Sequence, residues 1–325
     1  MRRPILLATT LLIAWLPIVA FSQDVSKGEW MSRYENGKFS LALRTESARD
    51  NSMFSWSFNL QLDRIEGFSM PQGGATATPV HFQLVRDAGT IVFDGMMKDG
   101  SGIGDYQFTA SHDYISAMKS MGYNNLSTEQ LLRLAVRDVN RGYVKEMKTA
   151  GFDSATVEEI IRLRNHDITT RFIAEMKALG FDGLSVNQIV RLSNHKINGA
   201  FIQEMKGAGY EGLSVEQLVR LRNHEIDVGF IRSLADAGYK SLSPEQLIRM
   251  RNHSVTPDFV RDLKSVGYEN IPAETLIRMR SRDVSPGFIK QLSDSGYKNL
   301  SPEDLIYIRD HGVEAYSKRQ LRRAQ

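Results

Sequence analysis

The 325-residue chain contains no cysteine. Disulfide bonds, thiolate metal sites and a catalytic thiol are therefore excluded, and so is a lipid-anchored cysteine behind a signal sequence. Any binding or chemistry must come from other residue types.

The chain also has little net charge. Lysine and arginine number 41 against 38 acidic residues, which gives a formal charge of +3. Affinity for nucleic acid comes mainly from neutralising phosphates, so this balance predicts no nucleic-acid partner. The apolar content of 42% is slightly low for a compact globule. A one-dimensional stack of repeats keeps more of its surface wet and tolerates such a composition better.

Catalytic motifs are missing as well. The sequence has no His-Glu-x-x-His pattern, no Gly-x-Ser-x-Gly, no phosphate loop and no glycine fingerprint after a strand. Asp63 with Glu66, or Asp87 with Asp94, could form paired carboxylates, but strands and turns often carry such pairs. We therefore expect a non-enzymatic protein without a cofactor; an enzyme would need a site in the strand region.

Long hydrophobic runs are absent apart from one near the start. Arg2 and Arg3 precede an apolar run from Ile5 to Leu16, which is short for a membrane span. Ala20 and Ser22 supply small residues for cleavage before Gln23. We expect a signal peptide at 1–22, a periplasmic or secreted protein, and no membrane span after cleavage. An uncleaved anchor is the alternative.

Residues 23–111 read as an antiparallel β domain. From Gly28 to Ala110 apolar and polar residues alternate, as in Phe39 to Leu43, which predicts half-buried strands. Asp87 to Gly89 and Asp99–Gly100 predict hairpin turns. We expect five to seven strands whose apolar face is covered by the first helix that follows.

A 29-residue unit repeated seven times occupies residues 112–313. One aromatic residue stands eight positions before a glycine in each unit, and a second follows that glycine. Three columns in phase over seven cycles identify a repeat protein. The glycine column, which we assign a structural role, consists of Gly122, Gly151, Gly180, Gly209, Gly238, Gly267 and Gly296.

Each unit predicts two short helices. Thr169 is a typical N-cap of the first helix, and the glycine column is its left-handed C′ position. Ser185 and Gln188 form a capping box at the second helix. The predicted fold class is α+β: the β domain, an α-solenoid of about seven helix-turn-helix repeats, and a polar basic capping helix at 314–325.

Histidine recurs after the second helix. Equivalent positions in adjacent units are about one helix spacing apart, too far to share one zinc ion. A cation that bonds the last carbonyls of a helix explains the column better, so we expect no metal. The column consists of His166, His195, His224, His253 and His311.

Two arginine columns differ in direction. An inner column, which includes Arg222 and Arg251, should cover its stems and bond loop carbonyls between units. An outer column lies opposite the leucines, most members with a glutamate four residues earlier. It is either a solvated face with weak ion pairs or a regular ladder for an acidic partner. The candidate binding residues of this ladder are Arg162, Arg191, Arg220, Arg249 and Arg278.

The unit from Phe201 to His224, Phe-Ile-x-x-Met-Lys-x-x-Gly-Tyr-x-x-Leu-Ser-x-x-Gln-Leu-x-Arg-Leu-Arg-Asn-His, resembles repeats in exported bacterial proteins of acidobacterial type. It is also similar to the extracytoplasmic repeat region of BlaR1-type M56 sensor peptidases, and the stretch from Arg86 to Thr90 resembles the β region before those repeats. The multi-span membrane part and zinc motif of those peptidases are not in this sequence. The resemblance implies an extracytoplasmic sensing or binding region without peptidase residues.

These observations lead to one expectation and one rival. We expect an exported binding protein that engages a protein or peptide partner, an acidic one if the outer arginines take part, through a solenoid surface. The rival is a detached sensor or regulatory domain that acts with a membrane signalling peptidase.

Overall fold

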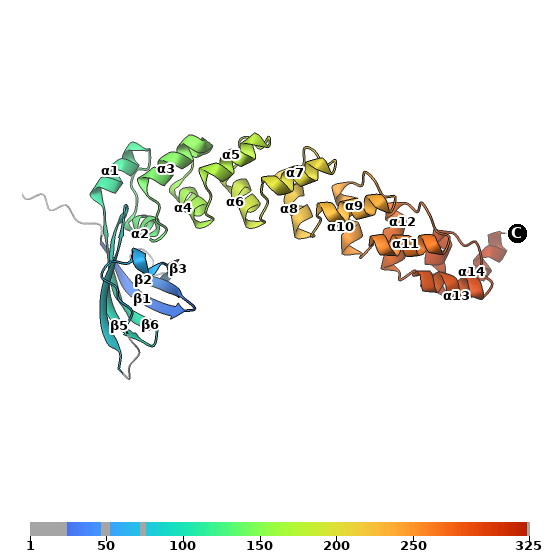
Figure 1. The fold of residues 1–325 in the computed structure, drawn as a ribbon, viewed down its shortest axis with the longest axis horizontal. Helices are drawn as coiled ribbons and strands as arrows, with labels where there is room; N and C mark the ends of the chain where they lie inside the picture. Colours follow the sequence, from blue (N-terminus) through green and yellow to red (C-terminus); the bar gives the residue numbers. More distant parts are fainter. Residues whose placement is uncertain (1–24, 47–52, 72–75, 324–325) are drawn as a thin grey trace, which may run out of the picture. The chain divides into compact units, whose positions relative to one another are not determined.

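The computed structural model describes residues 25–46, 53–71 and 76–323, and the predicted signal segment at 1–22 lies outside them. The α+β class is confirmed, because a six-stranded antiparallel sheet is followed by helices to the end of the described chain. Contacts divide the chain into two compact units, one up to Lys145 and one from Glu146 onward. The first unit therefore contains the sheet and the first helical repeat (Figure 1).

Six strands form one sheet in the order β3-β2-β1-β6-β5-β4, with every neighbouring pair antiparallel. Turns at Asp87 and at Asp99–Gly100 join β4 to β5 and β5 to β6 as predicted. A third hairpin, at Asn36–Gly37, was not predicted, although Asn-Gly is a strong signal for such a turn. The strands are β1 (Val25–Glu35), β2 (Lys38–Glu46), β3 (Met53–Leu60), β4 (Thr78–Arg86), β5 (Gly89–Lys98) and β6 (Ser101–Ala110).

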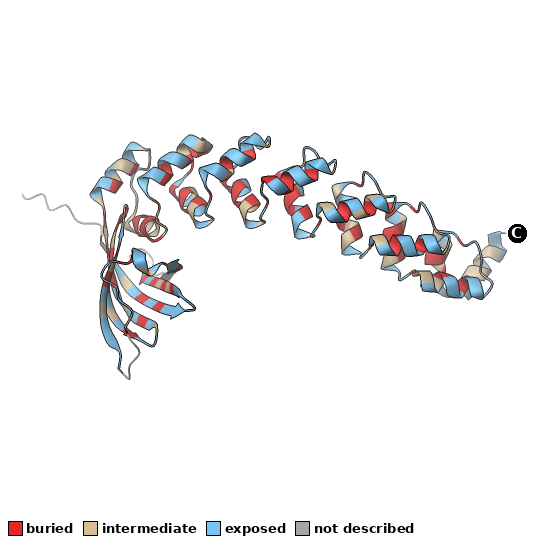
Figure 2. Ribbon diagram, in the orientation of Figure 1, coloured by how far each residue is buried: buried red, intermediate tan, exposed pale blue. Residues whose placement is uncertain are grey.

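The sheet curls around an aromatic core. β2 and β4 are separated by three strands in the sheet order, yet the rings of Phe39 and Phe82 are only 6.4 Å apart. In a flat sheet that separation would be about 19 Å. Phe68, just after the short 3-10 turn Leu62–Arg64, lies 5.0 and 5.2 Å from those two rings. Trp30 contacts Phe82 edge-on at 5.3 Å, so the concave face supplies the core of this unit (Figure 2).

The helix that packs on the sheet is α2 (Thr128–Val136), which contacts β1, β5 and β6. We had predicted that the first helix, α1 (His112–Ser120), would provide this cover, but α2 makes the larger contact with the sheet. The reason is composition. α2 buries the consecutive residues Leu134, Ala135 and Val136, whereas α1 has a single buried stripe.

Polar contacts attach the end of the first repeat and the start of the second to the β4–β5 turn. Arg141 forms an ion pair of 2.6 Å with Asp87, and its backbone N–H donates to the same carboxylate at 2.8 Å. Arg86 lies 3.5 Å from Asp138. The short motif at residues 86–89 thus positions the first helices as well as turning the chain.

The second unit consists of short helices in pairs. The even-numbered helices contact one another in chain order: α4 with α6, α6 with α8, α8 with α10, α10 with α12, and α12 with α14. The boundary between the units falls within α3 (Arg141–Met147), which continues into a π-helical turn (Lys148–Phe152). The helices that follow are α4 (Val157–Asn165), α5 (Thr170–Ala178), α6 (Val186–Asn194), α7 (Gly199–Gly207), α8 (Val215–Asn223), α9 (Val228–Asp236), α10 (Pro244–Asn252), α11 (Pro257–Ser265), α12 (Ala273–Ser281), α13 (Pro286–Asp294) and α14 (Pro302–Arg323).

Local hydrogen bonds fix the helix ends. Capping boxes form at α2, α4, α6, α8 and α10, as the sequence predicts. Pro272 replaces the cap of α12 and makes no side-chain bond there. α14 is interrupted at Gly312, where φ is 83° and ψ is 163°, so its last part is a separate helical segment.

Candidate binding surfaces

The outer arginines form a ladder that runs from one repeat to the next. Arg191 Nη1 lies 2.7 Å from Glu216 Oε2, and Arg220 Nη2 lies 2.6 Å from Glu245 Oε2. Arg249 pairs with Glu274 in the same way. The three arginine side chains remain 42–45% exposed. The ladder is therefore accessible, but its guanidinium groups already hold carboxylates.

These partners correct the sequence interpretation. We had expected each arginine to pair with the glutamate four residues earlier on its own helix. The observed glutamate lies 25 residues later, in the first turn of the next even-numbered helix. Because successive even-numbered helices stack directly, that first turn lies beside the arginine. Exposed pairs of this kind contribute about 0–1 kcal/mol each.

The two ends of the ladder differ from its middle. Arg162 donates to the side-chain oxygen of Asn187, which stands where the other units carry glutamate. Arg278 has no ion-pair partner among the described residues. Charge is therefore balanced in the middle of the ladder, and these two guanidinium groups have no carboxylate in the part of the chain that is described.

The inner arginines stack on aromatic rings, which the sequence analysis did not predict. The guanidinium of Arg251 lies 4.7 Å from the centre of the Phe230 ring, and Arg222, Arg280 and Arg309 repeat this contact at 5.0–5.1 Å. Three of these guanidinium groups also donate to carbonyls of the preceding unit, as predicted: Arg251 to Glu225 O at 3.2 Å, Arg280 to Ser254 O and Arg309 to Arg282 O. The available signal was the constant interval between the ring and the arginine in these units.

The histidine column joins repeats through side chains. His224 Nδ1 lies 2.8 Å from Asn252 Oδ1, and His253 Nδ1 lies 2.8 Å from Ser281 Oγ. Only His311 of these three bonds a terminal carbonyl, that of Tyr307 at 3.1 Å. The prediction that the imidazoles bond helix carbonyls is thus wrong for His224 and His253, because the end of the next even-numbered helix lies within their reach.

Every glycine of the repeat column adopts a left-handed conformation. The φ angles of Gly122, Gly151, Gly180, Gly209, Gly238, Gly267 and Gly296 lie between 90° and 114°. Six further residues end the even-numbered helices in the same region without being glycine, with φ of 50–54°. The sequence pattern did not reveal this second left-handed column, because no single residue type fills all six positions. They are Asp138, Asp167, Lys196, Glu225, Ser254 and Asp283.

The tyrosines after the glycines bond the next repeat. Tyr210, Tyr239 and Tyr268 donate their hydroxyl groups to the carbonyls of Leu242, Ile271 and Leu300 at 2.6–2.7 Å. Burial raises the pKa of all three phenols. Each bond spans 32 residues and fixes one repeat relative to its neighbour.

Two clefts in the second unit have equivalent linings. One, of about 280 Å³, is lined by Leu179, Phe181, Met205 and Tyr210 among others. The other, of about 240 Å³, has Ala237, Tyr239, Leu263 and Tyr268 at the same places, two repeats later in the chain. Lys206 and Glu211 lie at the first cleft, and Lys264 and Glu269, 3.7 Å apart, at the second. The repeat thus produces the same recess twice, each with one lysine and one glutamate in its lining.

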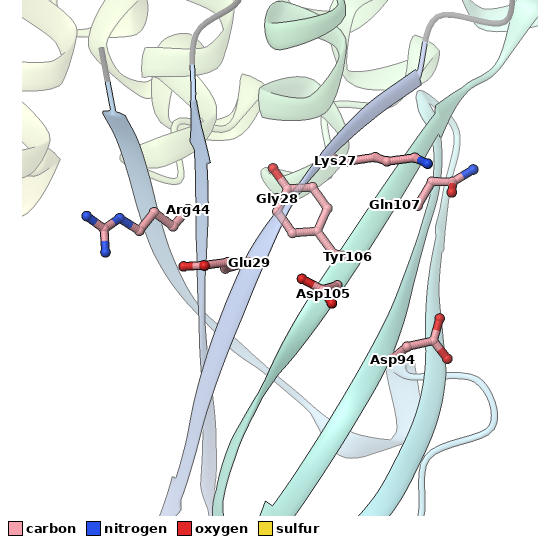
Figure 3. Close-up of a pocket in the computed structure, with 8 residues that line it drawn as sticks. All are labelled: Lys27, Gly28, Glu29, Arg44, Asp94, Asp105, Tyr106 and Gln107. Atoms are coloured by element: carbon pink, nitrogen blue, oxygen red, sulfur yellow. The ribbon is translucent and has the colours of Figure 1, made fainter. Parts of the chain in front are cut away.

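A shallower polar hollow lies on the sheet. It has a volume of about 760 Å³ and is lined by charged side chains of β1, β2, β5 and β6 (Figure 3). Asp94 there is bonded to His81 at 2.6 Å, while Asp87 is held by Arg141 and Glu66 accepts a bond from Gln83. Three of the four carboxylates that the sequence suggested as pairs therefore have other partners. The lining comprises Lys27, Gly28, Glu29, Arg44, Asp94, Asp105, Tyr106 and Gln107.

Within residues 25–46, 53–71 and 76–323, no three His, Asp or Glu side chains are grouped so that they could hold a metal ion. In the same residues no helix combines the length and the hydropathy that crossing a bilayer requires. A comparison with models of protein families finds no match, and a comparison with curated proteins finds none either. The resemblance to exported repeat proteins stays a prediction.

Proposed function

We propose that the chain is an exported, non-catalytic interaction protein whose helical repeats bind a protein or peptide partner in the cell envelope. The observation that carries this proposal is the pair of equivalent clefts two repeats apart. At about 240 and 280 Å³ they are smaller than the roughly 300–1,000 Å³ of typical ligand pockets. A recess of this size suits one side chain of a partner, and repetition lets a partner be held at several points.

The outer arginines add a preference for an acidic partner. Arg191, Arg220 and Arg249 already hold glutamates, whereas Arg162 bonds only a neutral amide and Arg278 has no ion-pair partner among the described residues. Carboxylates of a partner would therefore engage the two end members first. Displacing a glutamate from the middle costs only the small energy of an exposed pair.

Site-specific photocrosslinking in envelope preparations tests the proposal. A crosslinker at Leu179 or Ala237, which line the clefts, should capture a discrete partner that a crosslinker at exposed Gln203 does not. Equal capture at all three positions, or none at the clefts, would contradict it.

Two arginine variants separate the contributions. Arg162→Gln with Arg278→Gln should weaken capture and make it less sensitive to salt. The triple replacement of Arg191, Arg220 and Arg249 by Gln should act mainly on stability, because it removes ion pairs between repeats.

Export is tested separately: the mature protein should begin at or within a few residues of Gln23 on N-terminal sequencing.

A further inference from the structure

The outward face of the sheet carries a row of exposed apolar side chains. Met31 of β1, Ile103 of β6 and Met96 of β5 are direct partners in the strand register. Their exposed fractions are 52%, 64% and 41%. Since neighbouring strands are about 4.8 Å apart, the three side chains form a line about 10 Å long. Most other large apolar residues of the sheet are buried (Figure 2).

An acidic row lies beside this apolar row, two residues along each strand. Glu29, Asp105 and Asp94 are consecutive partners in the register, with Arg44 and His81 at the two ends. Glu29 and Asp105 have no ion-pair partner in the described chain, and both border the hollow of Figure 3. On the opposite flank Arg33 is paired with Glu35 at 3.1 Å, and Lys98 lies in the same register row through Ser101. The hollow holds three carboxylates against the two cations Lys27 and Arg44. An occupant of this face should therefore combine an apolar line with cations that reach Glu29 and Asp105.

The last segment of α14 has the complementary character. Val313 and Leu321 are 37% and 68% exposed, although most large apolar residues of the second unit are buried. With Ser317 they stand at intervals of four residues on one helix face, a line about 12 Å long. The cations of this segment are Lys318, Arg319, Arg322 and Arg323. Lys318 is paired with Glu314 and Arg319 lies over the Tyr307 ring, whereas Arg322 and Arg323 have no ion pair in the described chain.

We propose that the end of α14 in one copy of the chain docks across β1, β6 and β5 of a second copy. Leu321 and Val313 lie against Met31, Ile103 and Met96, and the cations of the helix face Glu29 and Asp105. The two surfaces are different, so the contact is head-to-tail and each dimer keeps one free surface of each kind. Assembly therefore continues into longer chains or closes into a ring. The apolar lines are short, so association should depend on concentration and weaken as salt is added.

Two single variants of the full exported chain test this arrangement by sedimentation velocity. Ile103→Lys places a cation in the apolar row, and Leu321→Glu places a carboxylate on the docking helix. Both sites are exposed, so the fold should be retained, as circular dichroism would verify. Wild type should show an average mass that rises with concentration at low salt, whereas each variant alone should stay monomeric.

Mixing the two variants is the decisive measurement. Ile103→Lys keeps an intact α14, and Leu321→Glu keeps an intact sheet face. An equimolar mixture of the two variants should therefore form a 1:1 dimer that grows no further. Val85→Lys, at an exposed apolar residue of β4 outside the row, should assemble as wild type does. A wild type that is monomeric throughout, single variants that still associate, or a mixture that stays monomeric would each overturn the proposal.

Discussion

Replacing Tyr239 by Phe removes a hydroxyl that joins two neighbouring repeats. The group donates to the Ile271 carbonyl at 2.6 Å, across 32 residues, and burial raises the pKa of the phenol. A hydrogen bond contributes a net 0.5–1.5 kcal/mol, and a buried acceptor left without a donor costs about 1–3 kcal/mol. Tyr239 is only half-buried, so water can replace part of the bond. We expect Tyr239→Phe to lower the free energy of unfolding by about 1–2 kcal/mol.

The position of this bond predicts more than a loss of stability. In repeat proteins each interface contributes separately, so a weakened interface lets the helices on its two sides unfold less cooperatively. Urea unfolding followed by circular dichroism should show a lower midpoint and a shallower transition. Wild type and variant should have equal helical content before unfolding.

The chain provides a matched control. Phe181 occupies the same column without a hydroxyl and lines a cleft together with Leu213, which stands where the other units carry the acceptor residue. Phe181→Tyr should form the missing bond and raise stability by about 0.5–1.5 kcal/mol. If Tyr239→Phe and Phe181→Tyr both unfold at the wild-type urea midpoint, the tyrosine column does not hold the repeats together.

Gly209→Val should lower the free energy of unfolding by about 1–3 kcal/mol through backbone strain alone. The φ angle there is 91°, and an added Cβ would meet no atom within 4 Å. An unchanged melting temperature would contradict the strain argument. Ser241→Gly should stabilise by about 1 kcal/mol, since Ser241 has φ of 57° where equivalent units carry Gly183 and Gly212. Ser243→Ala, two residues away, should instead lower the free energy of unfolding by about 1 kcal/mol, because it removes the cap of α10. Equal urea midpoints for Ser241→Gly and Ser243→Ala would contradict these two predictions. Burial raises the pKa of the three bonded tyrosines. Their contribution to the free energy of unfolding should therefore be fully present below the unfolded phenol pKa of about 10 and lost as pH rises above it. Urea midpoints that stay constant well above that pH would contradict this prediction.

The sequence by itself determined the local structure. The cap of each even-numbered helix is set in most units by a serine or threonine and a residue three positions later, and Ser185 with Gln188 forms the predicted capping box. The end of each odd-numbered helix is set by one glycine, and all seven are left-handed. Alternation of apolar and polar residues assigned the buried side of β2, from Phe39 to Leu43. These features need only a few consecutive residues, so no knowledge of the packing was required.

Tertiary structure decided which residues meet across repeats. Arg220 has one glutamate a single turn before it, Glu216, and another in the next repeat, Glu245, and only the stacking of the even-numbered helices selects the second. The carbonyl that accepts the Tyr239 hydroxyl and the pairing of His224 with Asn252 depend on the same stacking. The alignment of Met31, Ile103 and Met96 depends on strand order, because β1 pairs with β6 and not with β3. Such contacts depend on how neighbouring helices and strands are placed, and neither the alternation within a strand nor the period of the repeat contains that placement.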